Sequence, residues 1–196
     1  RLDDELLAEM AQTGCRIMGL GIESGSDRIL KVIGKRFTAD TVRRGLERLR
    51  KAGILPTVSI MVGQHTETAE DVDKYIALMR ESVRSNPNIQ YAFMMTTPFP
   101  GSELYAILLR EGRIRDDRDY YERYFSTRGD FKLVVNLSAM TDGELLRMYD
   151  RIQTAYLEEK RRVLPYRAFW VEDAMRRVGA RHEMVDRRLF APLRRS

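Results

Sequence analysis

The chain has 196 residues, of which 43% are hydrophobic, which is enough for one domain with a packed core. One cysteine excludes a disulfide framework, and one cysteine with two histidines argues against a metal site built from soft ligands. No apolar run reaches membrane-spanning length and the first residues do not resemble a signal peptide, so we expect a cytoplasmic protein.

The net charge of +5 is concentrated near the end of the sequence. Residues 160–196 hold 11 basic and 4 acidic residues, which leaves 23 and 25 for residues 1–159. A basic tail can meet phosphate or an acidic surface, but solvated faces of terminal helices explain it as well. One aromatic residue, Phe190, lies between Arg187-Arg188 and Arg194-Arg195, so the sequence gives no strong nucleic-acid signal.

The stretch at 16–23 predicts a strand with two different faces. Met18, Leu20 and Ile22 alternate with Gly19, Gly21 and Glu23, so one face is apolar and the other is small with a carboxylate at its end. Such a strand suits a barrel whose outer face meets helices and whose inner face leaves room for a ligand. A plainer alternative is an ordinary strand–helix turn in which Ser26 or Asp27 caps the next helix.

The same unit occurs twice more along the chain. Strands are predicted at 54–62 and 89–96, and each is followed by a helix with an apolar stripe. Thr38, Thr68 with Asp71, and Ser102 stand where helix caps are expected. Three strand–helix repeats in order predict parallel strands joined by right-handed crossovers. In the third strand we expect Tyr91, Met94 and Thr96 to face inward.

After Gly112 the pattern changes to charged and helical segments. A fourth strand is predicted at 131–137, a long helix opens with a capping box at 141–144 and ends at Pro165, and a second amphipathic helix follows to Gly179. The predicted fold class is α/β: a half TIM-like parallel barrel of βα units with a helical C-terminal extension. We place the barrel part at 1–115 and the mainly helical region with the basic tail at 116–196.

Three polar loops are predicted at one end of this sheet. They read GIESGS from Gly21, GQHTET from Gly63 and TPFPGSELY from Thr97. In this order they resemble the later strands of a radical S-adenosylmethionine (radical SAM) enzyme barrel, which carry G-I-E/Q-S-G, G-x-P-G-E-T and T-P-x-P-G-T sequences. The resemblance covers 1–115 well and extends loosely to about 170. The NLSAMTDGEL stretch is most similar to cobalamin-associated members.

The resemblance implies a site for SAM. Glu23 and Ser24 resemble positions that hydrogen-bond its polar part, Gly63 the backbone beside adenine, and Thr97 and Pro98 the rest of that pocket. His65 and Thr66 replace the proline and glycine of the second motif. His65 therefore contacts substrate as a donor or acid, or is a solvated loop residue. Glu67 is interpreted as a helix N-terminal residue and not as a catalytic one.

The family's CxxxCxxC motif, which holds a 4Fe–4S cluster, is absent, and Cys15 is interpreted as a small buried residue. That motif belongs to the first strand of such barrels, so we expect these residues to be the C-terminal half of a longer enzyme. The resemblance implies that the intact enzyme uses SAM, a 4Fe–4S cluster and, in the cobalamin-associated members, cobalamin. It would form a 5′-deoxyadenosyl radical that attacks an unactivated C–H bond, in methylation or oxidative cyclisation. The implied substrate is a small molecule or a lipid- or tetrapyrrole-like one.

Two other functions stay open at this point. The first is a non-catalytic half-barrel that binds an anionic partner through its basic tail. The second is another TIM-like enzyme that binds phosphate at its strand ends. Such an enzyme needs a glycine-rich phosphate-binding loop, and GIESGSD matches one only weakly. A tRNA-methylthiolating relative is disfavoured, because no small β-rich RNA-binding domain is visible in the sequence. In a half-barrel the strand at 16–23 has no upstream neighbour and no internal lysine or proline. We therefore expect dimerisation or aggregation through this edge, or tail helices that fold across the opening.

Overall fold

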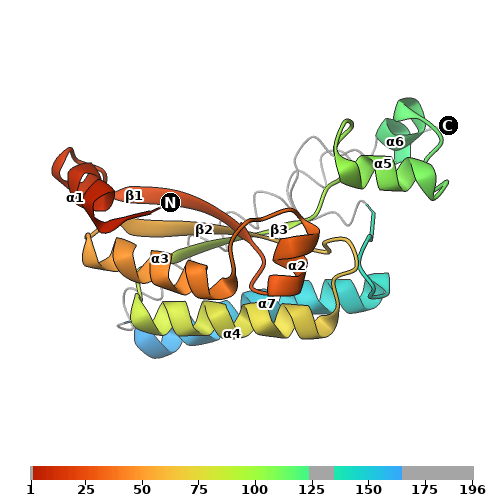
Figure 1. Ribbon diagram of the computed structural model, residues 1–196. Helices are drawn as coiled ribbons and strands as arrows, with labels where there is room; N and C mark the ends of the chain where they lie inside the picture. Colours follow the sequence, from red (N-terminus) through yellow and green to blue (C-terminus); the bar gives the residue numbers. More distant parts are fainter. Residues whose placement is uncertain (1, 124–134, 165–196) are drawn as a thin grey trace, which may run out of the picture.

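A computed structural model describes residues 2–123 and 135–164. Helices and strands alternate through its first two thirds, followed by helices alone (Figure 1). The elements in order are α1 Asp4–Gln12, β1 Ile17–Glu23, α2 Asp27–Val32, α3 Ala39–Lys51, β2 Leu55–Val62, α4 Ala69–Ser85, β3 Gln90–Met95, α5 Glu103–Arg110, α6 Asp117–Arg123 and α7 Asp142–Val163.

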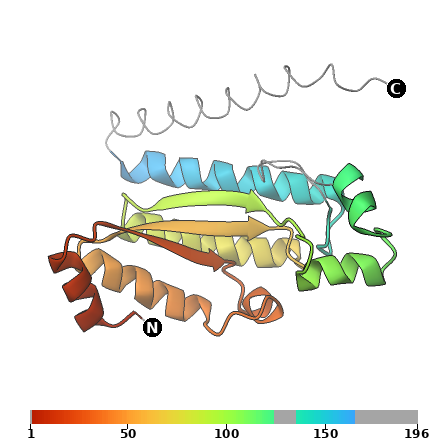
Figure 2. The same ribbon diagram turned by 90° about the horizontal axis from the view of Figure 1, so that it is seen from above.

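The three strands form one parallel sheet in the order β1-β2-β3. The helices α3, α4 and α7 cover one face of this sheet, and the other face is uncovered by the described residues (Figures 1 and 2). The short α5 and α6 lie beyond the C-terminal end of β3 and rise on the uncovered side (Figure 1). This arrangement confirms the predicted fold class, a partial parallel barrel with a helical C-terminal part.

Strand alternation separates a buried face from an open one. Pro56, Val58, Ile60 and Val62 of β2 are buried, and the residues between them are partly exposed. On β3 the buried residues are Tyr91, Phe93 and Met95, whereas Met94 remains 38% exposed. The expectation that Tyr91 faces inward is therefore wrong. A period of two places Tyr91 with Phe93 on the helix side, where its hydroxyl lies 2.7 Å from that of Ser82.

The helices begin where the sequence predicts. Thr38 caps α3 by accepting from the Thr41 N–H, and Ser102 caps α5 in the same way. Reciprocal capping boxes open α4 at Thr68 and α7 at Thr141. Each cap satisfies an N–H group that has no partner within its helix, which fixes the start of the helix after the loop. These helix starts determine where the three polar loops end.

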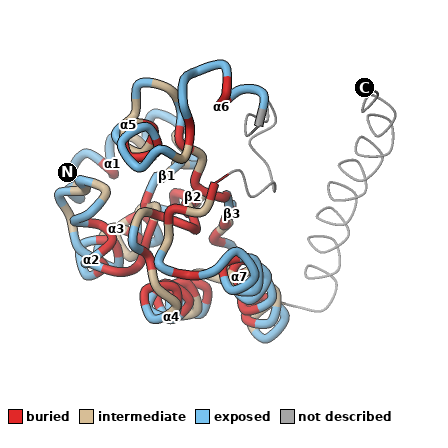
Figure 3. Tube along the Cα trace, turned by 90° about the vertical axis from the view of Figure 1, so that its right-hand side faces the viewer, coloured by how far each residue is buried: buried red, intermediate tan, exposed pale blue. Residues whose placement is uncertain are grey.

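The helix α7 docks on β3 and α4 through buried polar contacts. Tyr149 and Tyr156 donate their hydroxyls to the carbonyls of Phe93 and Ile89, at 3.0 and 3.3 Å. Lys160, only 1% exposed, donates to the Pro87 carbonyl at 2.7 Å. Most of the buried positions (red in Figure 3) therefore lie between the sheet and α4 and α7. The helix α7 shares this core, and the boundary at 115 stays a prediction.

A second, smaller core forms around α5 and α6. Its buried members are Tyr105, Ile107, Leu108, Ile114, Tyr120, Val135 and Leu137. The predicted strand at 131–137 lies largely outside the described residues, and 135–137 form no strand. The predicted helix up to Gly179 and most of the basic tail also lie outside them. Within 2–123 and 135–164, no helix is long and apolar enough to cross a bilayer.

Candidate functional site

The three polar loops meet at the C-terminal edge of the sheet, as their order predicts. Arg28 lies in the first turn of α2, directly after the first loop. It donates to the Thr66 carbonyl of the second loop at 2.7 Å. The Thr96 N–H at the start of the third loop donates to the Val62 carbonyl at 2.8 Å. The three loops lie close together because the strands are parallel, so that their carboxyl ends share one edge of the sheet.

Glu23 occupies an unusual backbone position at the end of β1. Its φ is +68°, which is rare for a residue other than glycine, and the register with β2 shifts between Gly21 and Glu23. The bulge turns the carboxylate back over Gly21, where an added Cβ would lie 2.6 Å from Oε1. The glycine at 21 therefore makes the space that this carboxylate fills on the open face.

The Glu23 carboxylate is only partly satisfied. Lys35 Nζ lies 3.9 Å from Oε1 and donates to the Gly21 carbonyl at 2.9 Å. Oε2 is buried and has no hydrogen-bond partner among the described residues. Burial raises the pKa of Glu23, against the opposing effects of Lys35 and the Ser59 hydroxyl. A strained residue with an unsatisfied buried oxygen is typical of a binding site.

The turn after Glu23 is held to α4 and not only to its own helix. Ser24 is 2% exposed, and its hydroxyl accepts from the Ser26 N–H at 3.2 Å. Ser26 forms no side-chain cap on α2; it donates to Asp71 at 2.6 Å instead. Asp27 accepts from the Ala39 N–H at 2.7 Å. Ser26 is the N-cap residue of α2, as the plainer alternative expects, but the side chains of Ser26 and Asp27 bind α4 and the start of α3 instead of the first turn of α2.

Asp71 and Arg28 form a network that the sequence interpretation missed. Asp71, 2% exposed, completes the capping box of α4 and also pairs with Arg28. Burial alone would raise the pKa of Asp71, but hydrogen bonds from Arg28, Ser26 and Thr68 together hold it well below its usual value. Arg28 also binds the Thr66 hydroxyl at 3.1 Å. The network locks the first loop to the second.

Glu67 holds the backbone of the second loop. It precedes the cap residue Thr68, is 3% exposed, and its Oε2 accepts from the N–H groups of Gly63 and Gln64 at 2.7 and 3.3 Å. Burial raises the pKa of Glu67 to about 7, although the two N–H donors lower it. The interpretation of Glu67 as an ordinary helix N-terminal residue is corrected: its carboxylate points back into the loop.

The other predicted site residues lie at the same edge. Gly63 has a φ of +86° and packs against Leu145, where an added Cβ would come within 3.1 Å. Thr97 is partly buried and donates weakly to the Met95 carbonyl at 3.4 Å, and Pro98 is buried. His65 is partly buried, and its Nδ1 has no partner among the described residues.

Three buried polar atoms without partners mark this edge. They are Glu23 Oε2, His65 Nδ1 and Thr96 Oγ1, and each belongs to the end of a different strand. Two hollows of about 620 and 450 Å³ lie elsewhere, at the free edge of β1 and between α3 and α4. Within the described residues, the candidate site is therefore an open sheet edge with unsatisfied polar groups, and not one of these hollows.

The comparisons with known proteins match this chain to part of longer enzymes. The profile described as "Radical SAM superfamily" matches residues 1–79. An uncharacterized methyltransferase of Pyrococcus horikoshii is 32% identical over 104 residues, which are 53% of this chain and 22% of the relative. The anaerobic magnesium-protoporphyrin IX monomethyl ester cyclase of Rubrivivax gelatinosus is 29% identical over 155 residues, 79% of this chain and 25% of the cyclase.

Two further matches are a tRNA-modifying enzyme and a solved methyltransferase structure. A tRNA-2-methylthio-N(6)-dimethylallyladenosine synthase of Paracoccus denitrificans is 36% identical over 101 residues, 50% of this chain and 22% of that enzyme. Among solved structures, the radical SAM methyltransferase TsrM of Kitasatospora setae, with cobalamin and a [4Fe-4S] cluster bound, superposes with a TM-score of 0.56 at 16% identity, over 85% of this chain and 35% of TsrM. The chain spans about a quarter of the length of these curated relatives.

Proposed function

We propose that this chain belongs to the radical SAM superfamily and supplies part of the SAM pocket and of the substrate wall in an enzyme of that superfamily. The observation that carries the proposal is the set of three partnerless buried atoms at the strand ends, Glu23 Oε2, His65 Nδ1 and Thr96 Oγ1. Buried polar groups in folded proteins almost always have partners, so a bound polar ligand is the simplest source of the missing ones.

The residues present fit SAM by their chemistry. SAM carries an ammonium group and ribose hydroxyls, which are donors, and the free oxygen of Glu23 is an acceptor. Gly63 presents backbone at the same edge, and its position is fixed by Glu67. Ser24, Thr97 and Pro98 stay proposed contacts. The Ser24 hydroxyl accepts from the Ser26 N–H in its own loop, which leaves its O–H as a donor toward the ligand.

The chain's own residues would position the ligand. Lys35 favours the ionised form of the Glu23 carboxylate and donates to the Gly21 carbonyl beside it. The Arg28–Asp71 pair and Glu67 keep two loops in one arrangement before any ligand binds, which lowers the cost of ordering them on binding. His65 is a proposed substrate contact. When bound, SAM supplies the radical chemistry of the superfamily.

The residues present do not fit an iron–sulfur cluster. Three thiolates are needed for a SAM-binding 4Fe–4S cluster, and this sequence has one cysteine. Cys15 precedes β1, whereas the candidate site lies at the other end of that strand. Within the described residues, no group of three metal-ligating side chains occurs. Cluster and cobalamin would be held by other parts of the whole protein, and we assign no residue of this chain to either.

The substrate side of the proposal follows from the relatives. We propose a small-molecule substrate, and a lipid- or tetrapyrrole-like one in particular, because one relative is named as a magnesium-protoporphyrin monomethyl ester cyclase and matches over 79% of this chain. Methylation and oxidative cyclisation are the reaction types that we propose for the whole enzyme. A cytoplasmic location stays a prediction.

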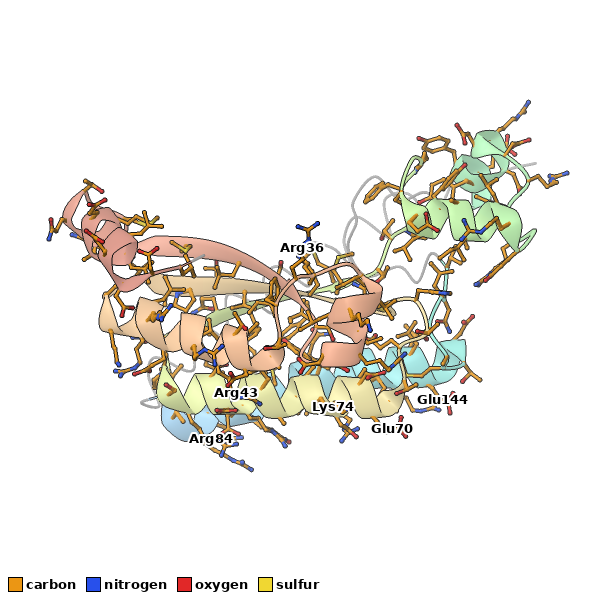
Figure 4. The ribbon with its side chains drawn as sticks, viewed as in Figure 1. Arg36, Arg43, Glu70, Lys74, Arg84 and Glu144 are labelled. Carbon is orange, nitrogen blue, oxygen red and sulfur yellow. The ribbon has the colours of Figure 1, made fainter. Side chains whose placement is uncertain are left out.

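Glu23→Gln tests the SAM site in the intact protein. Loss of a charged acceptor should weaken SAM binding about tenfold or more, as hydrogen bonds to charged groups contribute roughly 1.5–3 kcal/mol. Isothermal titration calorimetry under anaerobic conditions would measure this, with Glu70→Gln on the far side of α4 as the matched control (Figure 4). Unchanged SAM affinity, or unfolding of Glu23→Gln with normal affinity in the folded fraction, would make Glu23 a structural residue.

A further inference from the structure

The open face of the sheet carries smaller side chains than a sheet face that packs against another layer of protein. The middle positions of its three strands carry small side chains, listed in strand order as Gly19, Gly21, Thr57, Ser59 and Ala92. Larger side chains on this face stand toward the strand ends, namely Ile17, Leu55, Met61, Gln90 and Met94. The helix-facing positions of the same strands carry Leu20, Ile22, Val58, Ile60, Tyr91 and Phe93. A packed protein layer needs bulky apolar groups that interdigitate, and the open face has few of them.

We propose that this face binds a planar conjugated ring that carries a carboxylate, with Met61 and Met94 beneath the ring and Arg36 facing the carboxylate. The inference rests on the proposed function and names its substrate class. A flat ligand fits the small residues in the middle of the face, beside the Glu23 carboxylate that occupies the space over Gly21. At about 4.8 Å between strands and 3.3 Å per residue, this middle part of the three strands gives a floor of roughly 10 by 10 Å, the size of a multi-ring system.

Met61 and Met94 lie side by side on this floor. They are direct partners across β2 and β3, and the alternation of both strands places them on the open face. Met94 is 38% exposed, which is unusual for a large apolar side chain next to a partner of the same kind. Thioethers are polarizable and flexible, and they make favourable contacts with aromatic rings. The pair is therefore suited to the surface of a conjugated ring and less to a saturated chain.

Thr96 provides an independent sign of a ligand. It is 4% exposed, and its Oγ1 is buried with no partner among the described residues. Its N–H continues the β2–β3 ladder, so the alternation places Thr96 on the same face as Ala92 and Met94. A hydroxyl kept out of water beside an exposed methionine pair requires a polar partner. A ring with polar substituents or ring nitrogens supplies one.

Arg36 sets the charge of the proposed ligand. It is exposed, and within the described part of the chain it forms no ion pair or hydrogen bond. Figure 4 shows it projecting away from α3 and α4, on the open side of the sheet. The neighbouring Lys35 is already engaged by Glu23 and Gly21, so Arg36 is the cation left for an anion at this end of β1. A guanidinium binds carboxylate through two parallel hydrogen bonds.

The test measures binding of protoporphyrin IX, a planar ring with two carboxylates, to the 196-residue chain by the fluorescence anisotropy of the porphyrin. Its dimethyl ester, which lacks the charges, and palmitate, a flexible anion, serve as comparison ligands. The variants are Met94→Ala, Met94→Leu and Arg36→Gln. Leu146→Ala, an exposed apolar residue of α7, and Lys74→Gln on the underside of α4 are the matched controls.

We expect Met94→Ala to weaken porphyrin binding about fivefold, and Arg36→Gln to weaken it about tenfold without changing binding of the dimethyl ester. Palmitate should bind at least about tenfold more weakly than the porphyrin, and both controls should bind like wild type. If Met94→Ala fails to fold, Met94→Leu and Arg36→Gln carry the test, and the leucine variant should show a smaller loss than alanine.

Several results would overturn the inference. Equal binding of wild type and the folded variants would remove the site from this face. Palmitate as tight as the porphyrin would exclude a planar ligand, and an equal effect of Arg36→Gln on acid and ester would exclude the carboxylate contact. Dimerisation that covers this face and abolishes porphyrin binding would assign it to a second copy. The readout does not involve SAM, so failure here is distinguishable from failure of the Glu23 experiment.

Discussion

The two faces of the sheet are built from alternate residues of the same strands, yet they differ in almost every property. On β2, Val58, Ile60 and Val62 are 1–2% exposed and pack against helices. Between them, Thr57, Ser59 and Met61 are only partly buried. On the open side, Glu23 and Thr96 at the strand ends keep buried polar atoms without partners among the described residues. On the helix side the Tyr91 hydroxyl is paired with that of Ser82, whereas the Tyr75 hydroxyl has no partner among the described residues.

Within one strand, the residues on the helix side stabilise the fold, whereas the residues on the open side are available to bind a ligand. Residues on the helix side gain free energy by leaving water, and their loss should destabilise the protein. Residues on the open side gain little by folding, so changes there should affect ligands more than the fold. The predictions below test this division, beginning with the largest expected effect.

Ile60→Ala and Ser59→Ala are adjacent substitutions on opposite faces. Ile60 is 2% exposed, so its truncation should lower the free energy of unfolding by about 2–5 kcal/mol through lost burial and a cavity. Ser59→Ala should change it by less than about 1 kcal/mol. Urea denaturation followed by circular dichroism would measure both. Similar losses in the two variants would show that the open face is packed in solution.

Glu67 should make stability depend on pH between about 4.5 and 7. Its folded-state pKa, raised by burial to about 7, exceeds the unfolded value of 4.5, so the folded state holds this proton more tightly. Its contribution is therefore full below pH 4.5 and is lost as the pH rises to 7, by up to roughly 3 kcal/mol. Asp71 acts in the opposite direction, because its lowered pKa costs stability only as the pH falls below about 3.8.

Glu67→Gln isolates the first of these effects. Denaturation at pH 5 and pH 7.5 should show wild type more stable at pH 5, and the variant should lose most of that difference. Glu144→Gln is a useful control, since Glu144 is an exposed carboxylate whose capping contact at the start of α7 lowers its pKa. A variant that keeps the full pH dependence would mean that another group titrates in this range.

Gly25→Ala should destabilise the loop that carries Glu23. An added Cβ would lie 2.6 Å from the Tyr75 Cα, and backbone cannot move aside as a side chain can. We expect a loss of about 1–3 kcal/mol in the free energy of unfolding. Gly45→Ala is the matched control: its Cβ would meet only Leu2 at 3.8 Å, and alanine favours the helix by about 1 kcal/mol. A stable Gly25→Ala protein would mean that the loop can leave α4.

The edge of β1 is expected to give the smallest effect, a weak self-association. In the described residues β1 pairs only with β2, so one side of its backbone is open. The structure adds a restraint that the sequence analysis did not consider, because Lys35 from outside the strand donates to the Gly21 carbonyl. Sedimentation velocity should show a concentration-dependent dimer. A monodisperse monomer whose amides at 18–23 exchange like a free loop would contradict this.

Much of the architecture could be predicted because it depends on short-range patterns. The alternation at 16–23 and 54–62, the caps at Thr38, Thr68, Ser102 and Thr141, and the parallel repeat depend on residues two to four positions apart, and the structure confirms them. The three site loops could also be predicted, because parallel strands bring their carboxyl ends to one edge. The wrong face for Tyr91 was an error in applying the same period of two.

The sequence by itself determined the strands, their two faces and the loops that follow them. The long-range contacts that these loops make depend on the tertiary structure. Ser26 and Arg28 bind Asp71 across more than 40 positions of sequence, Gly25 is required by a contact with Tyr75, and Glu67 turns back to Gly63 instead of into its helix. Local periodicity carries no information about such pairs, because they depend on how α2 and α4 pack side by side. The positions of the partnerless atoms of Glu23, His65 and Thr96 depend on the same packing.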